Sequence, residues 1–251
     1  MNSKLISLTS RIKAAKNIRF YVTASQPCPY LDERHERKIF AALDGKDSIE
    51  LNDSLTDAGF RRSQNITYRP ACDMCAACVS VRVPTATFKL TPRWRRVVSA
   101  NTDIVARLVP AHATYEQFSL LQKYLTLRHL GAGMSEMSIF DYSTMVEETS
   151  VRTHVVEYRI GGAKGPLVAC ALVDALADGL SLVYAYFDPE YDKRSLGSFV
   201  ILDHIRQATE VGFAYVYLGY WVKGSIKMDY KVNFRPIEAL GAKGWEVLDA
   251  R

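Results

Sequence analysis

The sequence predicts a mixed fold of helices and strands, α/β (α+β), in which a smaller cysteine-containing N-terminal domain precedes a larger α/β domain. With 251 residues, of which 48% are apolar and 24% charged, the chain has a globular composition and length enough for a large core. Cysteines and positive charge gather in residues 1–100, whereas regular strand and helix patterns gather in residues 101–251. We therefore expect a domain boundary near residue 100.

The first 100 residues are expected to be loop-rich with one clear strand. Prolines at positions 70, 84 and 92 interrupt the pattern, while Cys78 to Phe88 alternates apolar and polar residues as a half-buried strand does. The N-terminus lacks a long apolar core and a small-residue cleavage site. No secretion signal is therefore predicted, and a cytoplasmic location is expected.

Residues 101–251 begin with a helix and a strand. Thr114 and Gln117 have the spacing of a capping box, and they predict a helix that ends at about His129. A strand is expected over residues 153–160. The apolar run Leu167–Phe187 is interrupted by charged and glycine residues, so it predicts two strands around a turn and no transmembrane helix.

The last part of the chain continues this alternation. Apolar residues at helical spacing predict a helix from about Ser198 to Val211. Ala214–Leu218 is an apolar strand that leads into Gly219-Tyr220-Trp221. The predicted order is strand, strand, loop, helix, strand.

Charge is distributed unevenly along the chain. Residues 1–100 contain 17 Lys and Arg against 9 Asp and Glu, which gives +8, whereas residues 101–251 carry −3. A basic half-molecule without an evident amphipathic basic helix favours a polyanion over a membrane as partner. A solvated basic face is the alternative interpretation.

Four of the five cysteines suggest a metal site. Cys72, Cys75 and Cys78 form a C-x-x-C-x-x-C pattern, and Cys28 lies upstream as a possible fourth ligand. This spacing favours an iron–sulfur cluster slightly over zinc; the alternative is thiols that pack or stay free. Cys170 lies in an apolar run and is expected to be buried. An odd number of cysteines argues against a disulfide framework.

Two further segments suggest ligand binding. Arg194-Ser195-Leu196-Gly197-Ser198 stands between a strand and a helix, where free backbone N–H groups bind anions. An R-x-x-G loop at this place resembles the pyrophosphate loop of the N-acetyltransferase-like (GNAT) fold, although a plain glycine bend is the commoner interpretation. In Tyr217–Pro236, aromatic residues interleave with lysines and an arginine. This pattern fits a surface that binds the end of a nucleic acid, or else an exposed edge strand.

Long motifs in this order resemble the arginyl-tRNA–protein transferase family, and within it the bacterial aspartate/glutamate leucyltransferases. They are GFRRSQNITYRPACDMCAACVSVRVP, KYLTLRHLGAGM, YFDPEYDKRSLGSFVILDHI and YLGYWVKGSIKMDYKVNFRPIEAL. The resemblance implies a GNAT-like acyltransferase domain that transfers leucine from leucyl-tRNA to the α-amino group of proteins with N-terminal Asp or Glu. The product would enter the N-degron pathway of protein degradation.

Three alternatives remain at this stage. Arginine could be the transferred amino acid, since a linear sequence does not reveal the aminoacyl pocket. An acyl-CoA N-acetyltransferase is disfavoured by the incomplete glycine loop and the basic cysteine-bearing segment. A non-enzymatic zinc or iron–sulfur RNA-binding module is disfavoured by the large acyltransferase-like second part.

The expected chemistry is direct aminolysis of the aminoacyl ester, with aminoacyl-tRNA as co-substrate. The attacking α-amine has an ordinary pKa of about 7.7–8.0, so alignment and oxyanion stabilisation are the main tasks. Ser225 stands where related sequences often carry Cys, so no obligatory thiol nucleophile is expected there. The early motif Cys28–Arg34 also departs from the Pro-Gly pattern of many relatives.

Candidate site residues follow from residue type and motif position. His129 and Asp188 are candidate general bases. The candidates for the cation that binds the acidic N-terminal side chain are Arg69, Arg82, Lys227 and Lys231. Met134, Tyr186 and Tyr220 are candidate walls of the leucyl pocket, and the basic first segment with Arg194–Gly197 is expected to meet the tRNA.

Overall fold

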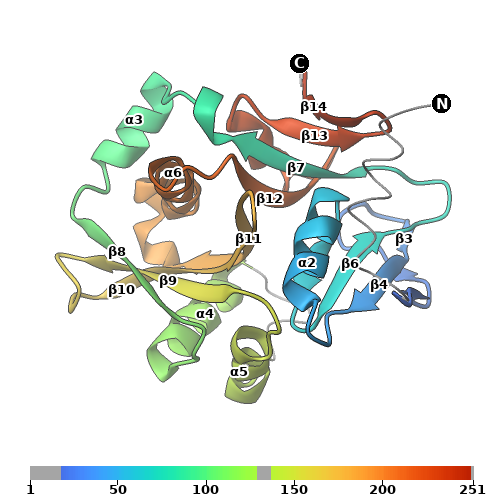
Figure 1. The fold of residues 1–251 in the computed structure, drawn as a ribbon. Helices are drawn as coiled ribbons and strands as arrows, with labels where there is room; N and C mark the ends of the chain where they lie inside the picture. Colours follow the sequence, from blue (N-terminus) through green and yellow to red (C-terminus); the bar gives the residue numbers. More distant parts are fainter. Residues whose placement is uncertain (1–17, 129–136, 250–251) are drawn as a thin grey trace.

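A computed structural model describes residues 18–128 and 137–249 of the chain (Figure 1). It contains three sheets. A four-stranded sheet has the order β1 (Tyr21–Val22), β4 (Lys38–Ala42), β6 (Ile66–Pro70), β5 (Arg61–Ser63), and β2 (Gln26–Pro27) pairs with β3 (His35–Glu36). An eight-stranded sheet has the order β14 (Gly244–Val247), β13 (Glu238–Gly241), β7 (Cys78–Pro84), β12 (Tyr215–Val222), β11 (Gly179–Phe187), β10 (Leu167–Ala175), β9 (Thr153–Ile160), β8 (Ile104–Pro110).

Helices connect and cover these sheets. The α-helices are α2 (Ser48–Asp57), α3 (Pro92–Ser99), α4 (Tyr115–Arg128), α5 (Ile139–Glu147) and α6 (Leu196–Glu210). Short 3₁₀ helices are η2 (Thr85–Thr87), η3 (Pro189–Arg194) and η4 (Asp229–Asn233). None of the helices in the described parts of the chain combines the length and apolarity that a membrane span requires.

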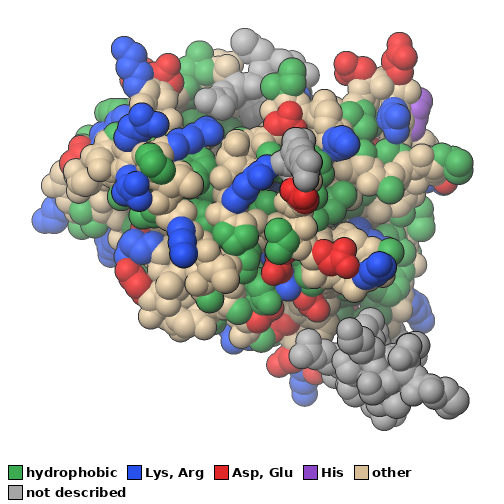
Figure 2. Space-filling view, turned by 90° about the horizontal axis from the view of Figure 1, so that it is seen from above, with side chains coloured by type: hydrophobic (Ala, Val, Ile, Leu, Met, Phe, Trp, Pro, Cys, Tyr) green, Lys and Arg blue, Asp and Glu red, His purple; other side chains and the backbone are tan. Residues whose placement is uncertain are grey.

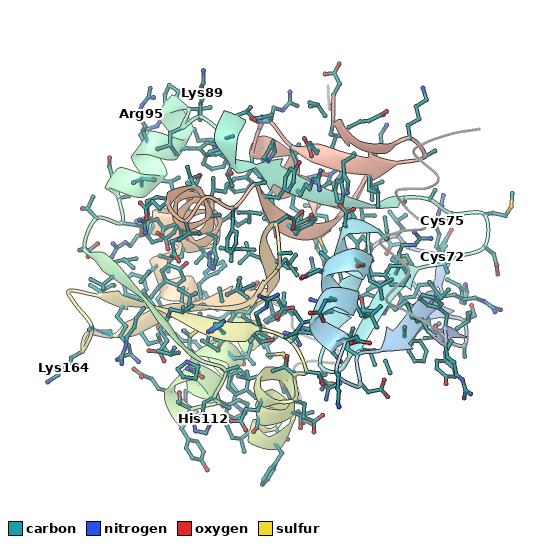
Figure 3. The ribbon with its side chains drawn as sticks, in the orientation of Figure 1. Cys72, Cys75, Lys89, Arg95, His112 and Lys164 are labelled. Atoms are coloured by element: carbon teal, nitrogen blue, oxygen red, sulfur yellow. The ribbon has the colours of Figure 1, made fainter. Side chains whose placement is uncertain are left out.

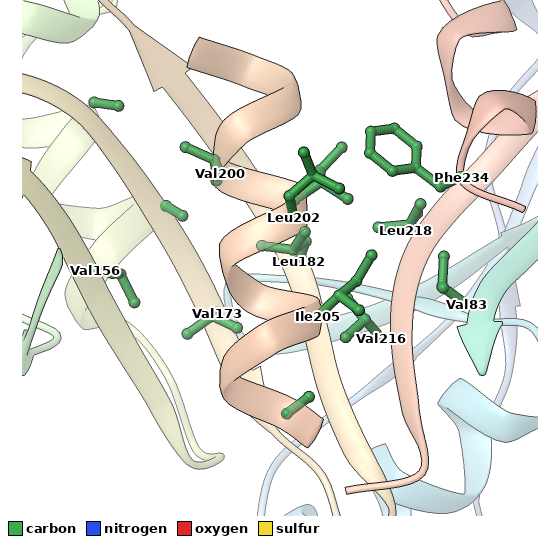
Figure 4. Packing of buried hydrophobic residues seen from close by; sticks show 14 of the residues in the cluster. Val83, Val156, Val173, Leu182, Val200, Leu202, Ile205, Val216, Leu218 and Phe234 are labelled. Atoms are coloured by element: carbon green, nitrogen blue, oxygen red, sulfur yellow. The ribbon is translucent and has the colours of Figure 1, made fainter. Parts of the chain in front are cut away.

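The large sheet is covered on both faces, and each face has its own core. On one face, α6 and α3 pack on the sheet, and Figure 4 shows Leu202 and Ile205 of α6 against Leu182 and Val173 of the strands. On the other face, α4 and α5 cover a second cluster that includes Cys170. Burial of apolar side chains against both faces explains why β10 consists almost entirely of buried residues.

The pairing of β11 with β12 is the one parallel contact in the described large sheet, and α6 forms the crossover between them. All its other strand pairs are antiparallel. A parallel pair needs a long connection, and a helix supplies it. Ligand sites favour the ends of strands beside such a crossover, so this part of the sheet is where we look for the site.

The first 100 residues contribute to the large sheet as well as to the small one. β7 lies between β12 and β13, and a buried ion pair of Arg62 with Asp174 (2.6 Å) joins the four-stranded sheet to β10. Both side chains are 1% exposed. The division expected at residue 100 stays a prediction, and strands from both sides of it share one sheet.

Several predicted elements are confirmed. β7 begins at Cys78, β10 and β11 form the hairpin expected from the apolar run, and α6 and β12 follow in the predicted order. The capping box is present, since Thr114 and Gln117 each accept the other's backbone N–H at 3.2 Å. The predicted helix end at His129 lies outside the described residues. The expectation of a loop-rich first segment is wrong in part, because α2 and α3 lie within it.

Candidate active site

Strands β11 and β12 part after a short contact. Their pairs join Gly179–Ser181 to Tyr215–Tyr217, while β11 continues to Phe187 and β12 to Val222. The Arg61 side chain enters from β5 of the small sheet, and its Nη2 donates to the carbonyls of Leu182 (3.0 Å) and Val183 (2.7 Å). A guanidinium from the first segment thus satisfies β11 carbonyls that no longer pair with β12.

Gly219 on β12 makes room for this guanidinium. A Cβ at Gly219 would lie 1.1 Å from Nη1 of Arg61, and the residue has φ +73°, where only glycine is unstrained. The pairing of β12 with β7 shifts register between Tyr217 and Gly219, which is a bulge. Arg61 and Gly219 therefore fit each other, and together they define the gap between β11 and β12.

Lys231 is a buried amine beside the same gap. It is 6% exposed, and its Nζ donates to the Tyr220 carbonyl at 2.6 Å. Burial, and then the positive charge of Arg61, lower the pKa of Lys231 well below its usual range. A lowered pKa favours loss of the proton, so Lys231 is less suited to be the lasting cation expected from the sequence and better suited to accept a proton.

Asp188 lies at the end of β11, where η3 begins. Its carboxylate accepts from Lys123 Nζ (2.8 Å) and from the Glu190 N–H (3.0 Å), and the residue is 9% exposed. The hydrogen bonds from Lys123 to Asp188 and Glu190 raise the pKa of Lys123. Asp188 is therefore held in a fixed orientation. The other predicted base, His129, lies outside the described residues.

The Arg194–Gly197 loop opens α6 as predicted. Arg194 pairs with the Asp103 carboxylate and donates to Asn101 Oδ1 at 3.1 Å, so its guanidinium is turned toward the segment between α3 and β8. A Cβ at Gly197 would lie 2.8 Å from the Phe187 ring, so this glycine allows close packing of α6 on β11. No side chain caps the first turn of α6.

Arg82, one of the predicted substrate cations, is embedded in the protein. It is 6% exposed, pairs with Glu238 (2.8 Å) and Asp57 (3.3 Å), and its guanidinium lies 3.5 Å from the Tyr215 ring centroid. These contacts match its charge with two carboxylates of the chain and join three distant segments. Arg69 is exposed on β6, over the Phe60 ring at 5.3 Å.

The three predicted pocket residues are not brought together among the described residues. Tyr186 is buried under α4 and α5, where its hydroxyl meets that of Tyr142 at 2.7 Å. The Tyr220 hydroxyl instead donates toward the carbonyls of Gly59 (2.9 Å) and Tyr68 (3.0 Å). Met134 lies outside the described residues. Lys227 is exposed in the loop after β12.

Cys28, Cys72, Cys75 and Cys78 share one neighbourhood, and all five cysteines are free thiols. Burial, and then the other three thiols, raise the pKa of Cys78 to about 12. The Ala77 N–H, and after it Arg34, lower the pKa of Cys75. Four thiols suit zinc or an iron–sulfur cluster, but within residues 18–128 and 137–249 no three metal-ligating side chains converge. A metal here stays a prediction, and no chemical step is routed through it.

A cavity of about 510 Å³ adjoins the cysteine loop and the end of β12. Its lining residues are Leu31, Asp32, Arg34, Ala76, Ala77, Val79, Trp221 and Lys223. Arg34 and Lys223 are exposed, and neither forms an ion pair with a described residue. The Trp221 indole N–H is buried without a hydrogen-bond partner in the described parts of the chain. None of these three residues was among the candidate site residues, although Arg34 ends the Cys28–Arg34 motif and the other two lie in the aromatic and basic segment Tyr217–Pro236.

Comparison with known proteins identifies the family. Residues 26–96 match the family model described as arginine-tRNA-protein transferase, N terminus, and residues 116–241 match the model of its C terminus. The chain belongs to the arginine-tRNA-protein transferase family. Its class is therefore that of an aminoacyl-tRNA–protein transferase, and the predicted α/β acyltransferase fold with a cysteine-bearing N-terminal region is confirmed.

Curated relatives are similar to this chain over most of their length. A protein of Phenylobacterium zucineum named aspartate/glutamate leucyltransferase is 57% identical, over 94% of this chain and 93% of the relative. Proteins with the same name from Caulobacter vibrioides (54%; 94% and 86%) and Rhizobium meliloti (52%; 93% and 93%) are also similar. Family membership disfavours the acyl-CoA acetyltransferase and the non-enzymatic RNA-binding module.

Solved structures resemble the chain more distantly. L-PGS from Bacillus licheniformis has a TM-score of 0.46 at 11% identity, covering 90% of this chain and 81% of that one. FemX has a TM-score of 0.45 at 10% identity, covering 90% and 69%.

Proposed function

We propose that the protein transfers leucine from leucyl-tRNA to the α-amino group of proteins that begin with Asp or Glu. One observation carries this proposal: relatives that are 51% to 57% identical bear the name aspartate/glutamate leucyltransferase. The modified proteins would then enter the N-degron pathway. We place the reaction in the cytoplasm, where charged tRNA is available.

The proposed chemistry is direct aminolysis at the gap between β11 and β12. The α-amine attacks the ester carbonyl, and the ribose hydroxyl of the tRNA terminus leaves. The gap supplies positive charge through Arg61, and the uncapped first turn of α6 offers backbone N–H groups for the oxygen that becomes negative. The proton of the attacking amine passes to a weak base, for which Asp188 and the Lys231 amine, with its lowered pKa, are the described candidates.

Direct aminolysis needs no covalent intermediate, and Ser225 tests this point. Ser225 is 4% exposed in the turn after β12, at a position where related sequences often have Cys. We expect Ser225→Ala to retain activity within about tenfold, which corresponds to about 1.4 kcal/mol of barrier. A thousandfold loss in a folded variant would instead indicate that the hydroxyl takes part in the reaction.

We infer that the cavity beside the cysteine loop receives the acidic side chain of the protein substrate. Arg34 and Lys223 give it two cations without carboxylate partners among the described residues, and Val79 gives it an apolar wall. Arg82 and Lys231 are less suited, because Arg82 is already paired with two carboxylates and Lys231 is buried with a lowered pKa. Lys223→Met should raise the KM for a peptide that begins with Glu, whereas Lys243→Met in the exposed turn between β13 and β14 serves as the control.

The experiment that tests the function uses labelled aminoacyl-tRNAs and peptides that differ only at residue one. Leucine should be added to peptides that begin with Asp or Glu, and poorly to those that begin with Asn, Lys or Ala. Arginine transfer in place of leucine would support the alternative within the family. Equal modification of a peptide that begins with Lys would refute the acidic specificity. Metal analysis and a visible spectrum of anaerobically purified protein test the predicted zinc or iron–sulfur centre.

A further inference from the structure

Helix α3 and the segment just before it carry cations that no described residue neutralises. Lys89, Arg93, Arg95 and Arg96 are all exposed, and none of them forms an ion pair with a described residue. The sequence contains no Asp or Glu between Asp73 and Asp103, so no nearby carboxylate along the chain offsets them. Figure 3 shows Lys89 and Arg95 pointing outward from this part of the fold.

The helix is fixed in one orientation. Trp94 on its inner side is 2% exposed and stacks on the Phe234 ring with centroids 4.6 Å apart and planes at 8°. Thr91 caps the first turn by accepting the Trp94 N–H, and Pro92 occupies the first helical position. Because the inner side chain is anchored, the charged side chains face solvent without any rearrangement.

The segment that follows α3 is attached to the residue that precedes the start of α6. Asn101 accepts from Arg194 Nε at 3.1 Å and donates to the Arg194 carbonyl at 2.9 Å. Arg194 directly precedes the residues that open α6, where the uncapped first turn lies. Helix α3 also contacts α6, so a polymer whose end is bound at that turn has α3 close by. Figure 2, seen from above, shows several Lys and Arg side chains on the side of the molecule where Figure 1 places α3.

We propose that the outer face of α3, with Arg93, Arg95 and Arg96, together with Lys89 just before the helix, binds the phosphate backbone of the tRNA acceptor stem. This inference rests on the proposed function, because it extends the tRNA from the gap between β11 and β12 to a defined second surface. Three of the four cations are arginines, which suit phosphate oxygens geometrically. Contacts of this kind position the nucleic acid without reading its sequence.

A membrane surface fits the same face less well. Leu90 is the one large apolar side chain between Lys89 and Arg96 that is exposed, at 42%, and Trp94 is buried. A helix that inserts into an interface needs a broad apolar face directed outward. Here the apolar side of α3 is turned into the core, so only charge remains for a partner.

The test measures binding of uncharged tRNA at several salt concentrations. Arg95→Gln/Arg96→Gln removes two charges from α3, and Arg107→Gln/Lys164→Gln removes two exposed charges from β8 and the β9–β10 turn as the matched control. Each lost phosphate contact should lower the slope of log affinity against log salt by about 1, so the α3 variant should lose about 2. The control should keep the slope. An unchanged slope in the α3 variant, or an equal loss in the control, would overturn the proposal.

A second measurement separates this proposal from the proposed function. Transfer is compared between full-length leucyl-tRNA and a 3′-aminoacylated trinucleotide that is too short to reach α3. We expect the α3 variant to raise the KM for leucyl-tRNA about tenfold with kcat nearly unchanged, and to leave transfer from the trinucleotide unaffected. Equal losses with both donors would overturn the surface proposal.

If the wild-type protein transfers leucine from neither donor, the proposed function fails, while the salt slope still decides the surface. Binding to anionic phosphatidylglycerol vesicles is measured alongside. Loss of vesicle binding with unchanged tRNA affinity would assign the face to a membrane and refute the proposal.

Discussion

Replacing Gly219 by alanine tests the arrangement that defines the gap between β11 and β12. At φ +73° an alanine costs about 1–2 kcal/mol of backbone strain. Its Cβ would lie 1.1 Å from Nη1 of Arg61, so the guanidinium has to leave. Arg61 then loses its hydrogen bonds to the Leu182 and Val183 carbonyls, which are worth about 1.5 kcal/mol each at the lower end for a charged donor.

The expected loss for Gly219→Ala is therefore about 4–5 kcal/mol in the free energy of unfolding, measured by urea denaturation. Gly161→Ala is the matched control, because Gly161 has φ +74° and its added Cβ would have nothing within 4 Å. That control should lose only the strain of about 1–2 kcal/mol. Equal losses in the two variants would refute the close fit of Arg61 against Gly219.

A double-mutant cycle measures the interaction between Arg61 and Gly219 independently of the backbone strain at position 219. Arg61→Ala alone should lose the two hydrogen bonds, about 3 kcal/mol. In the double variant the Cβ added at position 219 no longer collides with a guanidinium, so the combined loss should fall about 3 kcal/mol short of the sum of the single losses. Additive losses would show that the two positions do not interact.

Three further outcomes are expected. Because folding lowers the pKa of Lys231, the folded state binds fewer protons than the unfolded state at pH values above the lowered pKa. Lys231→Met should therefore gain more stability at neutral pH than at higher pH, and the gain should shrink as pH rises toward about 10. Urea unfolding at several pH values measures this gain, and a gain that grows with pH would contradict the assignment. Removing one partner of the buried ion pair, as in Arg62→Met, should lower the free energy of unfolding by about 3–5 kcal/mol, and the double replacement Arg62→Met/Asp174→Leu should lower it by less. Urea denaturation measures both losses, and a double variant as unstable as the single variant would argue against this pairing. Iodoacetamide should modify Cys75 well before Cys78, since the pKa of Cys75 is lowered and that of Cys78 is raised to about 12. Mass spectrometry of the peptides measures the order of modification, and the reverse order would be inconsistent with these environments.

The second half of the fold was predictable because its signals are local. The β10–β11 hairpin is indicated by an apolar run with a turn, and α4 by the capping box of Thr114 and Gln117. Comparable signals existed for two helices that the sequence analysis left out. Thr91 caps α3 and Pro92 occupies its first helical position, while Ser138 and Asp141 form a capping box for α5. The insertion of β7 into the large sheet had no local signal, because its partners lie more than a hundred residues away.

The site was less predictable than the fold, for a physical reason. Residue type identifies a cation, but its partners decide whether the charge is available. Arg82 resembles a substrate cation until Asp57 and Glu238 are brought beside it by the sheet. Arg61, which lines the gap, lies 121 residues from the first carbonyl that it meets. The lowered pKa of Lys231 could not be recognised from the sequence, because the burial that causes it is a property of the whole fold.

The central claim is leucine transfer to acidic N-termini by direct aminolysis. One competition measurement tests it: leucyl-tRNA and arginyl-tRNA at equal concentration are offered together to a mixture of peptides that begin with Glu and with Lys, and the products are identified by mass spectrometry. We expect the peptide with N-terminal Glu to gain leucine at its α-amine and the peptide with N-terminal Lys to stay largely unmodified. Addition of arginine, or equal addition of leucine to both peptides, would contradict it.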